Sequence, residues 1–576
     1  MKTNWDLSHL YKTTDDWNND FCILKEKMNL LNDKTQKLSI SNVKEYLKLM
    51  FEIDVLIEKL YCFAKRHLDL DSTLTFYEDM LNSALDIYNE SQILHNKFEN
   101  FIINSVESFS DFGEYQRYIE LIIRRKKHIM NAKNDEYSNY MNAKSRIKLD
   151  YQSLLNKNLK FESIEINGKK IDINRNNYNR LITNKNQEVR KEIFTKYTEG
   201  YKNIIEDISK LYIDKLTNDI LISNFEKYDN LLQKKLYELE LSNEILYNLI
   251  KSVNENLYVM YDYIEFKKKA SSLDKYYVYD TSISLCSMPT IEYSFEEAIE
   301  IVKNSLKILG DDYIEIIDKA LIDGWIDVYP NDYKRKMSFT SISYIGVPYI
   351  LLNYDKSINS VRTIAHEIGH SINVYYSKNR NNYEYFEFND FLIEIASKVN
   401  EFLFNEYLLD KSENEEIKKY LLNNIIGSIG NSLFGQVLLT EFEHSIINKL
   451  EVGEKVDLDV LNDEYMRLSK KYNGDSFEYI DDMKYGWSKI PHFIMQDTYS
   501  LYQYSIGTAI ATDIAYRILE HEDGFVQKYK NFLSLGNSVT VEEALSSIGI
   551  DLVNGNYVEN TVNVLNKKLS LIKKMY

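Results

Sequence analysis

The stretch SVRTIAHEIGHSINVYY, residues 360–376, contains the pattern H-E-x-x-H at residues 366–370. The stretch has no proline, and we expect it to be helical. Residues four apart on a helix share one face, so the imidazoles of His366 and His370 can point at one metal ion with Glu367 beside them. Zinc that performs chemistry needs three protein ligands, an open position and a carboxylate that accepts a proton from water. The pattern therefore predicts a catalytic zinc site. The alternative is a buried helix turn whose histidines are satisfied by neighbouring carbonyl groups.

Four acidic residues downstream of the histidines are candidates for the third ligand. Three of them lie in a polar stretch, rich in asparagine and tyrosine, that is typical of a loop: Glu384, Glu387 and Asp390. The fourth, Glu394, lies in the apolar helical stretch of residues 391–396, where a buried carboxylate is costly unless it is paired or bound to a metal. We therefore favour Glu394, although an ion pair with Lys398 one helical turn later would also explain this residue.

Two further observations concern the neighbourhood of these ligands. The longer metzincin pattern H-E-x-x-H-x-x-G-x-x-H requires glycine and histidine where this chain has Asn373 and Tyr376, so this pattern and its third histidine ligand are excluded. Glu401 lies two helical turns after Glu394, on the same face. It is placed to accept a hydrogen bond from a ligand imidazole, which would fix the tautomer and the orientation of that ring.

The chain resembles the M3 family of zinc metallopeptidases, specifically its oligoendopeptidase F branch. The resemblance rests on several separate blocks that follow one another in the family's order: residues 5–7 (WDL), 347–354 (VPYILLNY), 366–370 (HEIGH), 393–397 (IEIAS), 400–401 (NE), 487–493 (WSKIPHF) and 502–504 (YQY). It implies that His366, His370 and Glu394 hold a single zinc ion and that Glu367 is the general base.

The last two blocks imply further catalytic residues. Hydrolysis of an amide produces a tetrahedral oxyanion, which needs hydrogen-bond donors where the charge develops. A tyrosine hydroxyl or a histidine N–H can donate without competing for the metal. By resemblance to the family, His492, Tyr499 and Tyr502 are expected in this role. In a chain with 47 tyrosines, the alternative for each tyrosine is ordinary packing or surface exposure.

The chain departs from the family pattern at two places. Asn373 stands where the family often has a further histidine, but that histidine is not a metal ligand, so the expected metal site is unaffected. Residues 334–339 (KRKMSF) lack the glycine-containing pattern that usually precedes the strand. This difference concerns substrate preference and leaves the chemistry unchanged.

Residues 343–351 (SYIGVPYIL) are the clearest strand signal in an otherwise helical chain. They are β-branched and aromatic, and Pro348 favours an edge position. An exposed edge near a zinc site can hydrogen-bond the backbone of an extended peptide with little sequence preference. The alternative is a small structural sheet that shields its own edge.

The net charge of the chain limits the kinds of molecule that it is expected to bind. A formal net charge of −18 over 576 residues argues against nucleic acid. The basic run at residues 124–128 is interpreted as a solvated helix face.

No stretch of about 18 uncharged apolar residues occurs, which argues against a membrane span. The N-terminus lacks the apolar region of a signal peptide, and the three cysteines lie far apart (Cys22, Cys62 and Cys286), so we expect a cytoplasmic protein. The sequence does not indicate the oligomeric state.

The predicted architecture is mainly α. Helical patterns cover residues 15–181 and 187–269, strands concentrate in residues 276–354, and the remainder is helical to residue 576. Asn167-Gly168 predicts a tight hairpin turn. We expect an N-terminal helical lobe (residues 1–185) and a catalytic domain (residues 186–576). The family resemblance implies a two-lobed helical zinc-peptidase fold with a deep substrate channel and a small β-sheet near the active site.

A deep channel admits short unstructured peptides and excludes folded proteins. The expected function is therefore a zinc-dependent endopeptidase that cleaves internal bonds of oligopeptides. Two alternatives stay open. One is an exopeptidase of the dipeptidyl carboxypeptidase type, which would need a cationic group for the free C-terminal carboxylate. The other is a non-catalytic peptide-binding protein, against which the intact Glu367 argues.

Overall fold

The computed structural model describes residues 1–105, 111–125, 128, 135–387 and 391–576. The described residues are mainly helical with two small sheets, which confirms the predicted fold class. The chain divides into two compact units, each made of three separate stretches: residues 1–129, 290–407 and 514–549 form the first unit, and residues 130–289, 408–513 and 550–576 form the second. The boundary near residue 185 does not coincide with this division, because it lies inside the second unit. The domain assignment made from the sequence stays a prediction.

The first unit contains the N-terminal helices, a three-stranded sheet and the helix with the H-E-x-x-H pattern. Its helices and strands are α1 (Thr14–Thr35), α2 (Val43–Leu70), α3 (Thr75–Ser105), α4 (Gln116–Arg125), α12 (Phe295–Leu306), α13 (Asp311–Asp323), β3 (Ile326–Asp327), β4 (Phe339–Thr340), β5 (Ile350–Leu351), α14 (Ile358–Arg380), most of α15 (Ile393–Lys411), the end of α20 (Leu501–Leu519), α21 (Phe525–Leu533) and α22 (Val541–Ser546).

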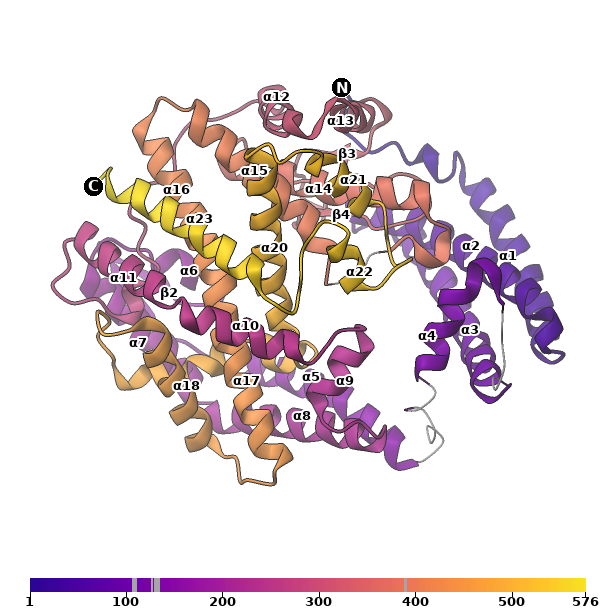
Figure 1. Ribbon diagram of the computed structural model, residues 1–576, viewed down its shortest axis with the longest axis horizontal. Coiled ribbons are helices and arrows are strands. Elements are labelled where there is room, and N and C mark those ends of the chain that lie inside the picture. The colour runs from indigo at the N-terminus through magenta and orange to yellow at the C-terminus, as the bar shows by residue number, and fades with distance from the viewer. Residues whose placement is uncertain (106–110, 126–127, 129–134, 388–390) are drawn as a thin grey trace. The chain divides into compact units, whose positions relative to one another are not determined.

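The N-terminal helices α1, α2 and α3 lie side by side (Figure 1). Helix α1 begins after a capping box, in which the Thr13 side chain accepts from the backbone of Asp16 and the Asp16 side chain accepts from the backbone of Thr13. Helix α2 buries an apolar face against its neighbours, and Tyr46 on that face stacks on Phe98 of α3 at 4.9 Å between ring centroids. Apolar burial between long amphipathic helices therefore forms the core at this end of the unit.

The sheet of the first unit has the strand order β3-β5-β4, with β3 parallel and β4 antiparallel to β5. The strand expected over residues 343–351 is shorter than predicted, and its expected edge position is wrong, because β5 is the central strand. Gly346, at φ +70°, turns the chain in the left-handed region, and the backbone of Ser341 bonds to that of Tyr349 at 2.7 Å. Residues 341–349 therefore form a loop. Among the described residues, β3 and β4 each pair with β5 alone and are the two edge strands.

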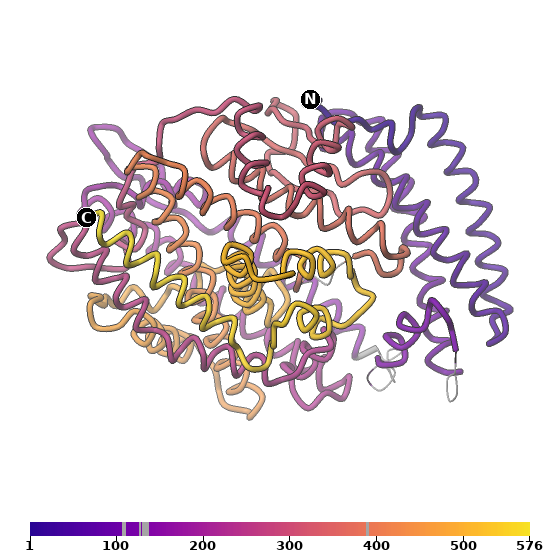
Figure 2. The backbone as a smooth tube through the Cα atoms, turned by 45° about the horizontal axis from the view of Figure 1, so that its top comes forward, coloured from indigo at the N-terminus to yellow at the C-terminus, as the bar shows by residue number. Residues whose placement is uncertain are grey.

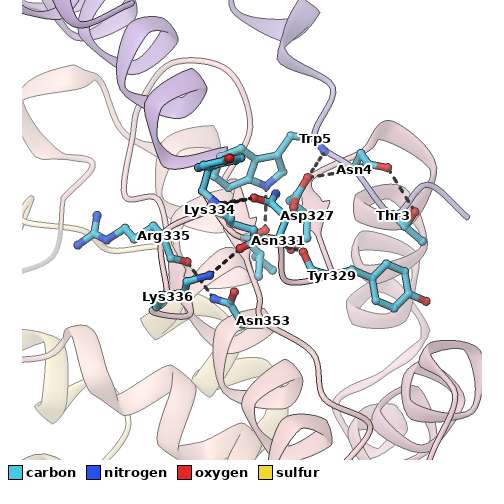
Figure 3. Close-up of polar contacts among 12 residues, drawn as sticks. Thr3, Asn4, Trp5, Asp327, Tyr329, Asn331, Lys334, Arg335, Lys336 and Asn353 are labelled. Atoms are coloured by element: carbon cyan, nitrogen blue, oxygen red, sulfur yellow. Dashed lines mark hydrogen bonds and ion pairs between the residues drawn. The ribbon is translucent and has the colours of Figure 1, made fainter. Parts of the chain in front are cut away.

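The N-terminal segment is held against this sheet by the carboxylate of Asp327 (Figure 3). Asp327 Oδ2 accepts from the backbone N–H of Trp5 at 3.4 Å and from the side chain of Asn4 at 3.3 Å. Its other oxygen accepts from the buried amine of Lys334 at 2.6 Å. Removing either partner would leave an uncompensated buried charge. The ion pair between Asp327 and Lys334 therefore stabilises the loop after β3 in this conformation.

Residues 334–339, where the chain departs from the family pattern, are tied down at several points before they enter β4. The backbone N–H of Arg335 donates to the Asp69 carbonyl at 3.0 Å, and the Arg335 guanidinium lies 4.9 Å from the ring centroid of Phe339. The Asn353 side chain donates to the Arg335 carbonyl at 3.0 Å (Figure 3). Basic side chains and their contacts thus hold this segment where the family uses glycine.

The second unit contains the remaining helices and a hairpin. Its elements are α5 (Asp135–Asn158), β1 (Ser163–Ile166), β2 (Lys169–Asp172), α6 (Tyr178–Leu181), α7 (Gln187–Lys202), α8 (Ile205–Phe225), α9 (Leu231–Glu238), α10 (Glu244–Glu255), α11 (Tyr258–Ala270), α16 (Glu415–Ile429), a π-helical turn (Gly430–Gly435), α17 (Gln436–Glu451), α18 (Leu458–Asn473), a 3-10 helix (Asp481–Lys489), α19 (His492–Met495), the start of α20 and α23 (Asn556–Lys573).

The hairpin predicted at Asn167-Gly168 is confirmed. Strands β1 and β2 pair antiparallel, and both turn residues have positive φ, at 53° and 74°. The C-terminal helix α23 runs along the segment that holds α10 and α11 and also packs on α16 (Figure 2). Within the part of the chain that the structure describes, no helix is long and apolar enough to cross a membrane.

Candidate metal centre

Helix α14 brings the two histidines of the pattern together. It begins after Ser357, whose side chain accepts from the backbone N–H of Ser360 at 3.2 Å, and it continues without interruption to Arg380. His366 and His370 are one turn apart on this helix, and their Nε2 atoms lie 3.2 Å from each other. The i,i+4 geometry expected from the sequence is therefore present.

Glu394, in the first turn of α15, completes the group. Its Oε2 lies 3.8 Å from His366 Nε2 and 3.7 Å from His370 Nε2. These three side chains are the one group of potential metal ligands found among the described residues. Four-coordinate zinc, with bonds of about 2.0–2.1 Å to nitrogen and oxygen, separates its ligand atoms by about 3.3–3.4 Å. The observed separations and the two-imidazole, one-carboxylate donor set fit a zinc ion.

Gly369, between the two histidines, sets the distance between α14 and α15. A Cβ atom at this position would lie 2.6 Å from the Ala396 carbonyl oxygen and 2.6 Å from Ser397 Cα, both of which belong to the backbone of α15. The side chain of Asn400 fixes the same contact by donating to the Ala365 carbonyl at 3.1 Å. Close backbone approach at a glycine therefore brings Glu394 within reach of the histidines.

Glu401 orients one of the two imidazoles. Its Oε1 lies 2.6 Å from His366 Nδ1, which leaves Nε2 of this ring directed toward Glu394 and His370. Burial opposes ionisation of Glu401, but the bond to His366 and the nearby charge of Lys398 lower the pKa of Glu401 to about 2. A carboxylate behind a ligand histidine fixes the tautomer and makes the ring a better donor to a metal. The contact expected from the sequence is present.

Glu367 is buried, with 5% of its surface exposed. Burial raises the pKa of its carboxyl group, although the neighbouring His366 and a hydrogen bond from Thr340 act in the other direction. The Thr340 hydroxyl, on β4, lies 2.7 Å from Glu367 Oε2 and 2.9 Å from the Glu367 carbonyl oxygen. Sequence reasoning missed Thr340, because a single threonine in a two-residue strand carries no pattern.

The other candidates for the third ligand lie elsewhere. Glu387 lines a cavity beside Glu58, and Glu384 is half-buried near Asn382. Asp390 lies outside the described residues. Lys398, the alternative partner of Glu394, has its amine 3.9 Å from Glu401. Of the candidates that the structure describes, Glu394 is therefore the one beside the two histidines.

The three residues expected to stabilise an oxyanion belong to the second unit. His492 begins α19, and its ring is perpendicular to that of Tyr504 at 6.3 Å. Tyr502 is fully buried at the start of α20, and burial raises the pKa of its hydroxyl. Tyr499 has a positive φ of 59°, a strained conformation for a tyrosine.

Two neighbouring residues on α17 hold Tyr499 in this conformation. The buried Glu443 carboxylate accepts from the backbone N–H of Tyr499 at 2.8 Å, and His444 Nδ1 lies 2.8 Å from the Tyr499 hydroxyl. Sequence reasoning missed both residues, because they lie 56 and 55 positions before Tyr499 in the chain.

Residues 180–564 match the sequence model of peptidase family M3. The chain belongs to this family. The oligoendopeptidase F homologue of Borreliella burgdorferi is 31% identical over 584 residues, which cover 99% of this chain and 98% of the homologue. Oligopeptidase PepF of Bacillus subtilis is 28% identical over 99% of this chain and 87% of its own length. The family membership expected from the sequence is confirmed, and this M3 peptidase is a metallopeptidase and a hydrolase.

Solved structures show the same fold. The crystal structure of a Chlamydophila abortus protein matches with a TM-score of 0.91 at 24% identity, covering 100% of this chain and 98% of that one. Oligoendopeptidase F of Enterococcus faecium matches with a TM-score of 0.72 at 21% identity, covering 98% of this chain and 99% of its own. The M3 peptidase therefore shares the whole extent of its fold with these proteins.

Proposed function

We propose that this M3 peptidase is a zinc-dependent endopeptidase that cleaves internal bonds of short, unstructured oligopeptides. The observation that carries the proposal is the meeting of three donor atoms from His366, His370 and Glu394 within 3.8 Å of one another, with the buried Glu367 next to them in the chain. The names of the relatives, oligoendopeptidase F and oligopeptidase, support the choice of short peptides as substrates.

The proposed chemistry assigns distinct tasks to the ligands and the base. When bound by His366, His370 and Glu394, zinc would acidify a water molecule and polarise the scissile carbonyl group. Glu367 accepts a proton from the attacking water and later delivers it to the leaving amine. Its burial raises its affinity for the proton, which suits a group that must hold and then release one.

The oxyanion that forms on the peptide carbon requires donors from elsewhere in the chain. We assign this role to Tyr502 and His492, with Tyr499 as a third candidate, from the family resemblance of residues 487–504. A tyrosine whose pKa is raised by burial keeps its proton at neutral pH and can donate it in a hydrogen bond.

Strand β4 is the proposed contact for the peptide backbone. It is an edge strand, and it carries Thr340, whose hydroxyl lies 2.7 Å from Glu367 Oε2. An extended peptide that adds to such an edge bonds through its main chain, so binding depends little on sequence. A deep channel and a cytoplasmic location, both expected from the sequence, complete the proposal.

The first experiment is cleavage of an internally quenched peptide of about ten residues, blocked at both ends, by zinc-loaded enzyme with and without a chelator. We expect internal cleavage that stops with the chelator and returns with zinc. Trimming of a free-ended peptide only, with the blocked peptide intact, would favour the exopeptidase alternative. The Glu367→Gln variant is the control: it should bind zinc normally and lack turnover. Unchanged turnover in this variant would refute the role of the general base.

A further inference from the structure

The second unit contains a cavity of about 1090 Å³ whose wall has no acidic residue. It lies where the end of α5 and the chain after β2 meet α6, α7 and the end of the 3-10 helix. The wall is built from asparagine amides, aromatic rings and three basic side chains: Lys160, Arg175 and Lys489. In a chain with 88 acidic and 70 basic residues, a large cavity with cations and no carboxylate is unexpected, and it indicates an anionic ligand.

The basic residues of the wall also form no ion pair with the described residues outside it. Within the described part of the chain, no carboxylate lies within 4.0 Å of the side-chain nitrogens of Lys160, Arg175 or Lys489. By contrast, the buried Lys334 lies 2.6 Å from Asp327, and Lys215 lies 3.6 Å from Asp219. Among the described residues, the three cations of the wall therefore have no carboxylate in contact: Lys160 and Arg175 are exposed, and the charge of Asp482 reaches Lys489 only from a greater distance.

Lys489 is the most constrained of the three. Its amine donates to the hydroxyl of Thr198 at 2.7 Å and lies 4.4 Å from the ring centroid of Phe194. The Lys489 side chain also borders a second cavity, of about 280 Å³. Burial lowers the pKa of Lys489 to about 7, because the charged form has lost water, and the charge of Asp482 opposes this shift only in part. A bound carboxylate would restore the missing opposite charge and occupy donors that Thr198 leaves free.

The remaining wall combines stacked aromatic rings with amide side chains, which suits a peptide. Tyr197 is held between two other rings, with Tyr178 at 3.7 Å and Phe161 at 4.7 Å, both nearly parallel to it. The side chains of Asn156 and Asn179 offer amide donors and acceptors of the kind that pair with a peptide backbone. The volume is far larger than an inorganic anion requires, so the ligand has a body as well as a charge.

We propose that this cavity is a second binding site, in which Lys489 and Arg175 hold the carboxylate of a peptide. The carboxylate is either the free C-terminus or an acidic side chain, and the two share the same recognition chemistry. The choice of a peptide as the ligand rests on the proposed peptidase function, whereas the anionic character of the ligand rests on the cavity alone.

The test is calorimetric titration of the zinc-loaded Glu367→Gln protein, which should leave the probes uncut. Three probes share one neutral sequence: a peptide with a free C-terminal carboxylate, its C-terminal amide, and an amide with one internal glutamate. We expect at least one of the two acidic probes to bind about tenfold or more tightly than the neutral amide, since hydrogen bonds to charged groups are the strong ones. The acidic probe that binds more tightly identifies the source of the carboxylate.

The variants assign the preference to the cavity. Arg175→Gln changes an exposed residue and should fold normally, and Lys489→Met removes the buried amine. In the Glu367→Gln background, each should reduce the preference for the acidic probe about tenfold and leave binding of the neutral amide unchanged. Lys484→Gln is the matched control. It removes the same charge from the same 3-10 helix, where Lys484 lies 2.8 Å from Asp481, and should retain the preference.

Equal binding of the acidic and neutral probes would overturn the proposal, as would a preference that survives both cavity variants. Binding of inorganic phosphate with no acidic peptide bound would also overturn it, because the ligand would then not be a peptide. These results are separate from the cleavage experiment. An enzyme that fails to cut blocked peptides but shows the preference would refute the proposed endopeptidase and keep this site.

Discussion

The hydroxyl of Thr340 lies 2.7 Å from the carboxylate of Glu367, so the edge strand β4 and the proposed general base are directly connected. The same hydroxyl lies 2.9 Å from the Glu367 carbonyl oxygen, which belongs to helix α14. A peptide that pairs with β4 would therefore lie on the strand that orients the base. This relationship makes Thr340 a positioning residue for the reaction.

Thr340→Val keeps the shape of the side chain and removes the donor. We expect kcat to fall by about tenfold, the effect of losing about 1.4 kcal/mol of stabilisation, with KM and zinc content unchanged. Thr340→Ser, which keeps the hydroxyl, should restore most of the activity. The measurement is steady-state cleavage of the quenched peptide, together with metal analysis. Wild-type kcat in Thr340→Val would show that the contact does not position Glu367.

Glu401→Gln should weaken zinc binding without removing a ligand. The amide can still accept from His366 Nδ1, but it no longer carries the charge that strengthens that bond. We expect zinc affinity to fall by about 10-fold to 100-fold, measured by competition with a chromophoric chelator. Glu406→Gln is the control: it changes the same charge on the same helix, where Glu406 lies 2.5 Å from the Tyr516 hydroxyl. Equal zinc affinity in both variants would exclude a specific role for Glu401.

Gly369→Ala tests the close approach of α14 and α15. The added methyl group would lie 2.6 Å from the backbone of α15, so the helices must separate. We expect a loss of about 1–3 kcal/mol of stability and weaker zinc binding, since Glu394 moves with α15. Gly427→Ala in α16 is the matched control, because nothing lies within 4 Å of the added atom. That variant should keep or slightly raise the melting temperature. Similar melting temperatures and zinc affinities for the two variants would refute the packing argument.

Glu58→Gln tests a pH-dependent contribution to stability in the first unit. Burial raises the pKa of Glu58 from 4.5 to about 7, although its Oε1 accepts from the backbone N–H of Tyr344 at 2.9 Å. The folded state thus holds the proton more tightly than the unfolded state. This contribution is complete below the unfolded pKa of 4.5 and is lost as the pH rises through about 7.

A glutamine at position 58 stays neutral at every pH and can still accept from Tyr344. The variant should therefore gain stability relative to the wild type on going from about pH 5 to about pH 8, by at most about 3 kcal/mol. Thermal unfolding of both proteins at the two pH values gives the comparison. A stability difference that is the same at both values would show that Glu58 titrates normally.

The grouping of His366, His370 and Glu394 could be predicted from the sequence because it follows local rules. Two histidines one helical turn apart share a face in any helix, and Glu394 was chosen from four nearby acidic residues. Burial alone does not explain Glu394, since its side chain is 44% exposed. What brings it to the histidines is the backbone contact at Gly369, a residue that the pattern contains but does not explain.

The contacts between distant stretches could not be predicted. The central position of β5 depends on β3, which pairs with it over only two residues, too short a stretch to give a pattern of its own. Thr340 and Glu443 are single polar residues whose roles depend on contacts with Glu367 and Tyr499, 27 and 56 positions away. Hydrophobic periodicity carries no information about such pairs.

The alternation of the two units along the chain has a consequence for biosynthesis. The Trp5 indole donates to the Ile350 carbonyl, and the Asn373 side chain of α14 donates to the Leu533 carbonyl, so the first unit needs residues from three stretches of the chain. Neither unit can be completed on the ribosome before most of the polypeptide has been made. The long helices α1 to α3 can form early, because their contacts are local. Truncation at any single point between residues 130 and 513 would leave both units without part of their core.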